Sequence, residues 1–261
     1  MAEKFYSHTA YNYVENNPLN MVDPDGKSGE AVIDKENKTV TVTSHFYFYG
    51  SYATQAYADK AKDQIKKQWN DANGTIEIDG TEYSVVFNIT GEVVSTQQAE
   101  KLAAENGDNV VNNFIRIASL SEGLKDSKGN LIPSSYMISS EGSPFASSNS
   151  GLFLIEDLQN LSTAAHEYGH GLGWFAFGGP DGGAHEPEKR DDSEPGIMTA
   201  RGTKVPDKYG ILWQPAGNRR IDPDKRRVLV TDVQNVLYSV RGALSRGEKA
   251  KLGIANNVIR K

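Results

Sequence analysis

The sequence predicts an α+β fold with a mixed twisted sheet, and three observations support this prediction. Short stretches in which β-branched and aromatic residues alternate with polar ones are typical of strands. Longer stretches with apolar residues three or four positions apart are typical of helices. The two kinds of segment do not follow the regular order of a parallel βαβ sheet. With 261 residues, 38 % of them hydrophobic, the chain can bury one substantial core.

The strands are expected to be short and to include two hairpins. Polar residues 35–38 separate the first two strands, and Asp79-Gly80, a dipeptide typical of two-residue hairpin turns, separates the next two. Strands are expected at residues 31–34, 39–49, 76–78, 83–89, 114–118, 136–139 and 152–155.

Four helices are expected, the last of which forms a C-terminal helical part. They cover residues 52–70, 96–105, 161–172 and 231–244. Gly74 and Gly107 follow the first two helices, as glycine often does at a helix end. Thr231 is expected to cap the last helix, and no element is assigned to residues 246–261.

Residues 166–170 read His-Glu-Tyr-Gly-His within the third expected helix. Positions i and i+4 of an α-helix lie on the same face, about 6 Å apart along the axis, so His166 and His170 can bind one metal ion. Glu167 lies beside the first histidine and can act as a general base on a water molecule without binding the metal. This HExxH spacing predicts two zinc ligands and a catalytic carboxylate.

A catalytic zinc site needs a third protein ligand, and the sequence offers more than one. His185 follows the glycine-rich residues 178–184, which could turn the chain back towards the helix. Asp207 is the alternative third ligand. Three acidic residues of the same region remain further alternatives: Glu186, Glu188 and Glu194.

His166, Glu167, His170 and Gly173 form the pattern HExxHxxG, which resembles the zinc-binding motif of metzincins. In that family a third His follows, and then a turn that contains Met, which Gly196-Ile197-Met198 resembles. The resemblance implies a metzincin-like zincin fold with His185 as third ligand and Met198 beneath the histidines. By the same analogy, residues 152–155 are expected to border the cleft and to hold a substrate in extended form. Gly173 is expected to end the active-site helix with a positive φ. His185 lies 12 residues after Gly173, a longer spacing than is usual, although the leishmanolysin branch has an insertion here.

Residues 202–210 resemble the second motif of aspzincins, Gly-Thr-x-x-Asp-x-x-Tyr-Gly. Gly202, Thr203, Tyr209 and Gly210 match, but Asp207 stands one position late. By this resemblance Asp207 would bind zinc. Tyr209 is a candidate hydrogen-bond donor to an oxyanion.

Residues 11–26 resemble the C-terminal end of the core of Rhs-repeat (YD-repeat) proteins, at the junction with a variable toxin domain. Pro18, Asp23, Pro24 and Gly26 match the junction motif, whereas Lys27 stands where the family usually has Leu. The resemblance implies that residues 1–27 end an Rhs core and that residues 28–261 are the toxin. It also implies an Rhs shell, a cognate immunity protein, and secretion or delivery into a target cell as part of a larger effector.

Composition excludes several other classes of protein. There is no cysteine, and therefore no disulfide framework, thiolate metal site or cysteine nucleophile. The sequence shows no apolar run long enough to span a membrane and no signal peptide. It also lacks a G-x-S-x-G elbow and a phosphate-binding loop.

Residues 216–261 carry 11 Lys and Arg against 4 Asp and Glu, in a chain of net charge −6. A basic segment with one aromatic residue, Tyr238, makes nucleic acid an unlikely partner. The sequence therefore predicts a zinc-dependent endopeptidase that acts as the toxin domain of an Rhs-type effector on a protein or peptide substrate. The alternatives are a non-hydrolytic metal-binding effector module and a nucleic-acid-directed toxin that uses the basic segment.

Overall fold

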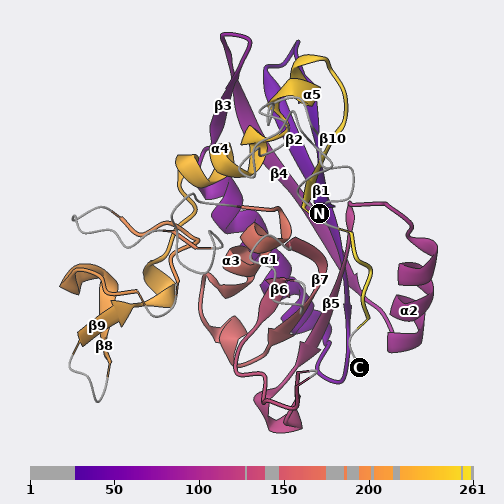
Figure 1. The fold of residues 1–261 in the computed structure, drawn as a ribbon, viewed down its shortest axis with the longest axis vertical. Helices are drawn as coiled ribbons and strands as arrows, with labels where there is room; N and C mark the ends of the chain where they lie inside the picture. The colour runs from indigo at the N-terminus through magenta and orange to yellow at the C-terminus, as the bar shows by residue number, and fades with distance from the viewer. Residues whose placement is uncertain are drawn as a thin grey trace, which may run out of the picture.

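The computed structural model describes residues 27–126, 128–138, 147–174, 185–186, 194–200, 203–213, 218–253 and 255–259. Within these residues the chain forms a curled mixed sheet of eight strands, a separate two-stranded sheet and five α-helices (Figure 1). This arrangement agrees with the predicted α+β class. The strands of the large sheet are β1 (Lys27–Asp34), β2 (Thr39–Tyr49), β3 (Thr75–Ile78), β4 (Thr81–Val93), β5 (Asn112–Ala118), β6 (Tyr136–Ile138), β7 (Ser147–Leu154) and β10 (Ala250–Gly253).

The long strand β2 organises the large sheet. One edge of β2 pairs with β4 in parallel over ten residues. Its other edge pairs first with β1, antiparallel, and then with β5, parallel. The sheet continues from β1 to β10 and from β5 through β7 to β6. The small sheet consists of β8 (Gly210–Trp213) and β9 (Asn218–Ile221).

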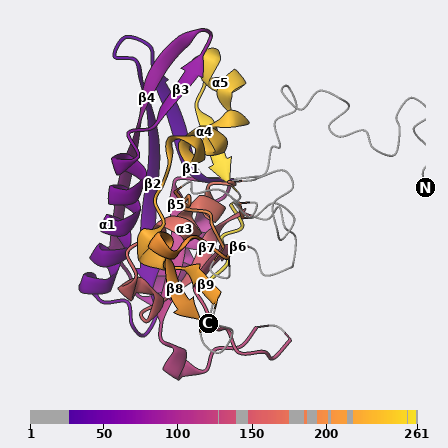
Figure 2. The ribbon, with the colours of Figure 1, turned by 90° about the vertical axis from the view of Figure 1, so that its left-hand side faces the viewer.

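Four helices cover one face of the sheet, and α2 (Thr96–Glu105) lies on the opposite face (Figures 1 and 2). The four are α1 (Gln55–Asp71), α3 (Thr163–Gly171), α4 (Val230–Tyr238) and α5 (Arg241–Ser245). The alternation along β2 explains the two layers. Phe46 and Phe48 point into the main core, whereas Tyr47 and Tyr49 pack with the alanines of α2.

Two of the expected helices have boundaries that differ by one to three residues, and a capping side chain explains the later start of the first. The helix expected from residue 52 begins at Gln55, because Thr54 is its N-cap and accepts a hydrogen bond from the Tyr57 N–H. Ser95 precedes α2 and forms a capping box with Gln98. The helix expected over residues 161–172 is shorter and spans Thr163–Gly171.

The prediction of one helix from Thr231 to Leu244 is wrong. The structure has two helices, α4 and α5, over this range. They are separated by a turn in which Val240 N–H donates to Leu237 C=O, three residues earlier, instead of four as in an α-helix. Thr231 lies inside α4, and the N-terminal Leu229 N–H donates to the Asp232 carboxylate instead. The sequence analysis also missed β10, which pairs antiparallel with β1.

The expectation that residues 152–155 border the cleft is also wrong. Most of this segment belongs to β7, which lies between β5 and β6 and so has both edges occupied. Of the strands that the structure describes, β6 is the one at this end of the sheet. The described helices include none with the length and apolar character needed to cross a membrane.

Candidate metal centre

Helix α3 is buried along its whole length, and its packing fixes which side chains face the site. All nine of its residues are buried. Tyr168 points into the core, where its ring meets Phe46 and Trp69 and its hydroxyl lies 2.6 Å from Ser44 Oγ. Trp69 Nε1 donates a hydrogen bond to the Ala165 carbonyl at 3.1 Å. These contacts fix the rotation of the helix about its axis and so the directions of His166 and His170.

The structure brings His166, His170 and His185 together. One ring nitrogen of each lies within 4.8 Å of the others, and the ring centroids are 4.8 to 5.2 Å apart. His166 and His170 are buried, and His185 is partly exposed. Three imidazoles in this arrangement suit a divalent ion such as Zn²⁺ and leave room for a non-protein ligand. Of the candidate third ligands that the structure describes, His185 belongs to this group.

Hydrogen bonding assigns the ring nitrogens of His166. Its Nδ1 lies 2.7 Å from the Ile197 carbonyl oxygen, which can only accept, so Nδ1 carries the proton. Nε2 therefore has a free lone pair for a metal ion. A hydrogen bond from the ring nitrogen that does not bind the metal is typical of histidine ligands in metalloproteins.

Both helix histidines are held in the neutral form that a metal ion requires. Burial lowers the pKa of His170 to about 3, with the neighbouring His185 and Arg226 as further causes. Burial is also the main cause that lowers the pKa of His166 well below its usual value, and the Arg226 charge adds to it. Neutral imidazoles bind metal without first losing a proton.

Glu167 follows His166 in α3, and its side chain is only 8 % exposed. The structure thus shows a buried glutamate directly after a histidine of the cluster, and its role as a general base stays a prediction.

Met198 packs directly against the middle of α3. The side chain is fully buried, and its Sδ lies where a Cβ at Gly169 would stand. Any larger residue at position 169 would displace the sulfur. The turn around Met198, residues 196–199, closes with a hydrogen bond from Thr199 N–H to Gly196 C=O at 3.2 Å. Met198 therefore lies against the helix turn that separates His166 from His170.

Gly173 ends α3 with a φ of +82°, the left-handed conformation expected from the sequence. The Gly173 N–H donates to His170 C=O, and the Trp174 N–H donates to Gly169 C=O, both at 3.0 Å. This pair of bonds is the Schellman motif, which turns the chain sharply away from the helix axis.

The other candidate residues lie in different places. Asp207 is exposed on a one-turn helix, Asp207–Tyr209, and lies outside the histidine group that the structure describes. Tyr209 is partly exposed and its ring lies 4.8 Å from Lys208 Nζ. Glu186 is buried, and its carboxylate accepts hydrogen bonds from Gly196 N–H and Thr199 Oγ1. Glu194 is exposed, and Glu188 and Gly202 lie outside the described residues, as do residues 11–26.

Sequence reasoning missed two charged residues that surround the 196–199 turn. Arg226 is 3 % exposed; its Nη1 donates to Thr199 C=O at 3.2 Å and its Nε donates to Ser162 Oγ at 3.1 Å. Asp232 is 1 % exposed and accepts from Ile197 N–H at 3.3 Å. Both follow the HExxH motif by more than 50 residues, and neither belongs to a recognisable spacing.

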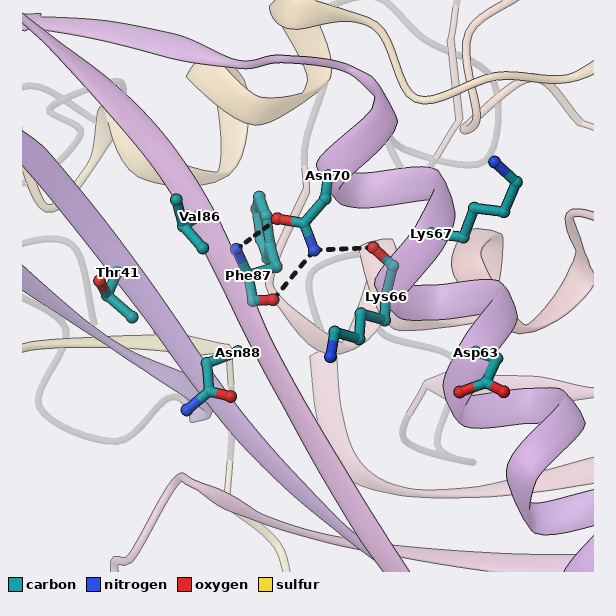
Figure 3. A pocket seen from close by; sticks show the side chains of 8 residues that line it. All are labelled: Thr41, Asp63, Lys66, Lys67, Asn70, Val86, Phe87 and Asn88. Atoms are coloured by element: carbon teal, nitrogen blue, oxygen red, sulfur yellow. Dashed lines mark hydrogen bonds between the residues drawn. The ribbon is translucent and has the colours of Figure 1, made fainter.

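A separate surface groove of about 710 Å³ lies between α1 and strands β2 and β4 (Figure 3). Its lining residues are Thr41, Asp63, Lys66, Lys67, Asn70, Val86, Phe87 and Asn88. The Asn70 amide binds both main-chain groups of Phe87, at 2.9 and 3.0 Å, as a neighbouring strand would. These hydrogen bonds therefore connect the end of α1 to β4. None of the residues that line the groove belongs to the histidine group described above.

Comparison with models of protein families gives no match for this chain, and comparison with curated proteins gives none either. The function proposed below therefore rests on the metal centre and on the resemblances of the sequence.

Proposed function

We propose that the protein is a zinc-dependent endopeptidase of metzincin-like fold. The observation that carries the proposal is the convergence of His166, His170 and His185, with Glu167 next to the first of them. When bound, zinc would polarise the scissile carbonyl and lower the pKa of a water molecule. Asp207, as an exposed residue away from the three imidazoles, is the weaker choice of third ligand.

Glu167 is the general base in this proposal. It takes a proton from the attacking water and later passes the proton to the leaving amine, so one carboxylate serves both halves of the reaction. Low exposure favours this role, because it keeps the carboxylate within the buried helix that carries His166 and His170. Tyr209 remains a candidate oxyanion donor.

The substrate in this proposal is a protein or peptide that binds in extended form along β6. Helix α3 packs against β6 and β7, so this strand borders the element that carries His166 and His170. In the described part of the sheet β6 is the last strand at its end, which is the position at which an extended peptide would add a further strand.

The test of the peptidase proposal is Glu167→Gln. The variant should bind zinc as the wild type does and lose peptide hydrolysis by at least about 100-fold, because general acid–base catalysis contributes about 10² to 10⁴. Glu77→Gln, on an exposed position of β3, is the control and should keep full activity. A zinc-loaded Glu167→Gln protein that still cleaves a generic unfolded substrate would refute the assigned base.

We also propose that the peptidase acts as the toxin domain of an Rhs-type effector, on the strength of the resemblance in residues 11–26. An immunity protein that covers the cleft is the expected partner. Production of residues 28–261 inside bacteria should arrest growth, and the same chain with Glu167→Gln should not. Wild-type zinc-loaded protein without hydrolytic activity would instead favour the non-hydrolytic metal-binding module.

A further inference from the structure

The 196–199 turn connects two of the three histidines. The Ile197 carbonyl accepts the Nδ1–H of His166. The Met198 carbonyl accepts the N–H of Glu186, the residue after His185, at 3.1 Å. A displacement of this turn would therefore move both imidazoles relative to His170.

Asp232 connects the same turn to the end of α3. Its Oδ2 accepts from Ile197 N–H at 3.3 Å and from Leu229 N–H at 2.8 Å. Its Oδ1 accepts from the indole Nε1–H of Trp174 at 3.0 Å. Trp174 follows Gly173, so one carboxylate joins the C-terminal end of the histidine-bearing helix to the turn that holds His166.

Capping of α4 explains only one of the three hydrogen bonds that Asp232 accepts from Leu229, Ile197 and Trp174. The hydrogen bond from Leu229 N–H is a capping contact within the N-terminal turn of α4. The bonds from Trp174 and Ile197 come from outside the helix, and capping does not require them. A carboxylate with 1 % exposure is costly to bury, and three N–H donors offset part of that cost.

We propose that Asp232 is a positioning residue of the metal centre, which sets the separation between α3 and the 196–199 turn and so holds His166 in its metal-binding orientation. The inference deepens the proposed function, because it concerns the same site. It depends on metal binding by the three histidines and is independent of whether the site hydrolyses peptides.

The main test is Asp232→Asn in the full chain, with Zn²⁺ affinity measured by competition with a chelator at pH 7. An amide presents one acceptor and two donors, so its NH₂ group must face at least one of the three N–H groups. We expect zinc affinity to fall about 10- to 100-fold, the usual effect of losing a residue that orients a metal ligand. The absorption spectrum of bound Co²⁺ should change as well, because the imidazole directions change.

The control is Asp157→Asn, which makes the same substitution at a buried aspartate. Asp157 is 8 % exposed and accepts from Ser135 N–H and Ser135 Oγ, away from the turn. Zinc affinity and the Co²⁺ spectrum of this variant should match the wild type even if its stability falls. An equal loss of affinity in both variants would overturn the proposal in favour of general destabilisation.

Trp174→Phe tests the same link without altering the cap of α4. Phe keeps an apolar ring of smaller volume and removes the indole donor to Asp232. We expect a smaller loss of zinc affinity in the same direction, and this variant decides the question if Asp232→Asn does not fold. Wild-type affinity and an unchanged Co²⁺ spectrum in the folded variants would refute the positioning role. If the affinities follow the expected order but the wild type cleaves no peptide, the positioning role stands and the peptidase proposal fails.

Discussion

The histidines of the metal centre illustrate how burial prepares a residue for binding. Water would leave an imidazole partly protonated near neutral pH, whereas the interior of this protein disfavours the charged form of His166 and His170. The carbonyl of Ile197 then fixes which nitrogen of His166 carries the proton. Neutrality and orientation are thus properties of the folded chain before any ion binds.

The lowered pKa values predict how the metal-free protein responds to acid. In the unfolded chain His170 takes up a proton near pH 6.5, but in the folded chain only near pH 3. The free energy of unfolding should therefore fall as pH drops from about 6.5 towards 3. Each such histidine contributes up to about 1.4 kcal/mol per pH unit.

Urea unfolding of the metal-free protein at pH 7, 6 and 5 measures this slope. His170→Gln removes one titrating group and should make the slope shallower. Identical slopes for the variant and the wild type would contradict the assigned cause.

At the residue scale, the sequence was sufficient to identify the two histidines of the helix and insufficient to identify the residues that hold them in place. The i, i+4 spacing identified His166 and His170 because one helix sets their geometry. His185 was found as one of several options and needed the fold to join it to the other two. Asp232 and Arg226 gave no signal, because a hydrogen bond between distant segments leaves no periodic pattern in the sequence.

At the scale of the elements, the packing of α3 depends on the absence of a side chain at Gly169. Met198 occupies the space next to Gly169, so the helix and the 196–199 turn approach more closely than two ordinary side chains allow. The close approach lets the turn reach His166. Helical propensity alone would favour a larger residue there, since glycine costs about 1 kcal/mol relative to alanine.

Gly169→Ala tests this contact, because helical propensity and the clash with Met198 change the free energy of unfolding in opposite directions. If propensity dominated, the variant would be more stable by up to about 1 kcal/mol. We expect the clash with Met198 to dominate and to destabilise the protein by about 1 to 3 kcal/mol in urea unfolding. The double variant Gly169→Ala, Met198→Ala should lose less than the sum of the two single effects, because the second change frees the space. Strict additivity would show that the two positions do not interact.

The elements were predicted best where one local signal determines them. The Asp79-Gly80 turn, the alternation of β2 and the bounds of α2 are all present. The break between α4 and α5 was missed because the apolar spacing of residues 231–244 continues across it. The four residues of β10 have no pattern of their own, and their partner in β1 lies more than 200 positions earlier.

At the scale of the whole molecule, the sheet joins the beginning and the end of the described chain. β1 lies between β2 and β10, so the strand that opens the domain is paired on both sides. The segment after β10 is fastened as well: Asn149 Oδ1 accepts from the N–H groups of Asn256 and Asn257. Completion of this sheet therefore needs the last part of the chain.

Leu252→Ala measures how much β10 contributes to the whole fold. Leu252 is 2 % exposed and belongs to the main core, so its truncation should cost about 2 to 5 kcal/mol in the free energy of unfolding. Lys251→Ala is the control on the same strand. Its side chain is directed to the exposed Asp108, and an exposed ion pair of this kind contributes at most about 1 kcal/mol. Equal losses in the free energy of unfolding for the two variants would show that the packing of β10 contributes little to the stability of the fold.

The antiparallel register of β1 and β10 also bears on mechanical resistance. Lys27 faces Gly253, so the outer ends of the two strands lie at the same end of the ladder. A force applied to these two points would open the ladder one rung after another instead of shearing all rungs at once.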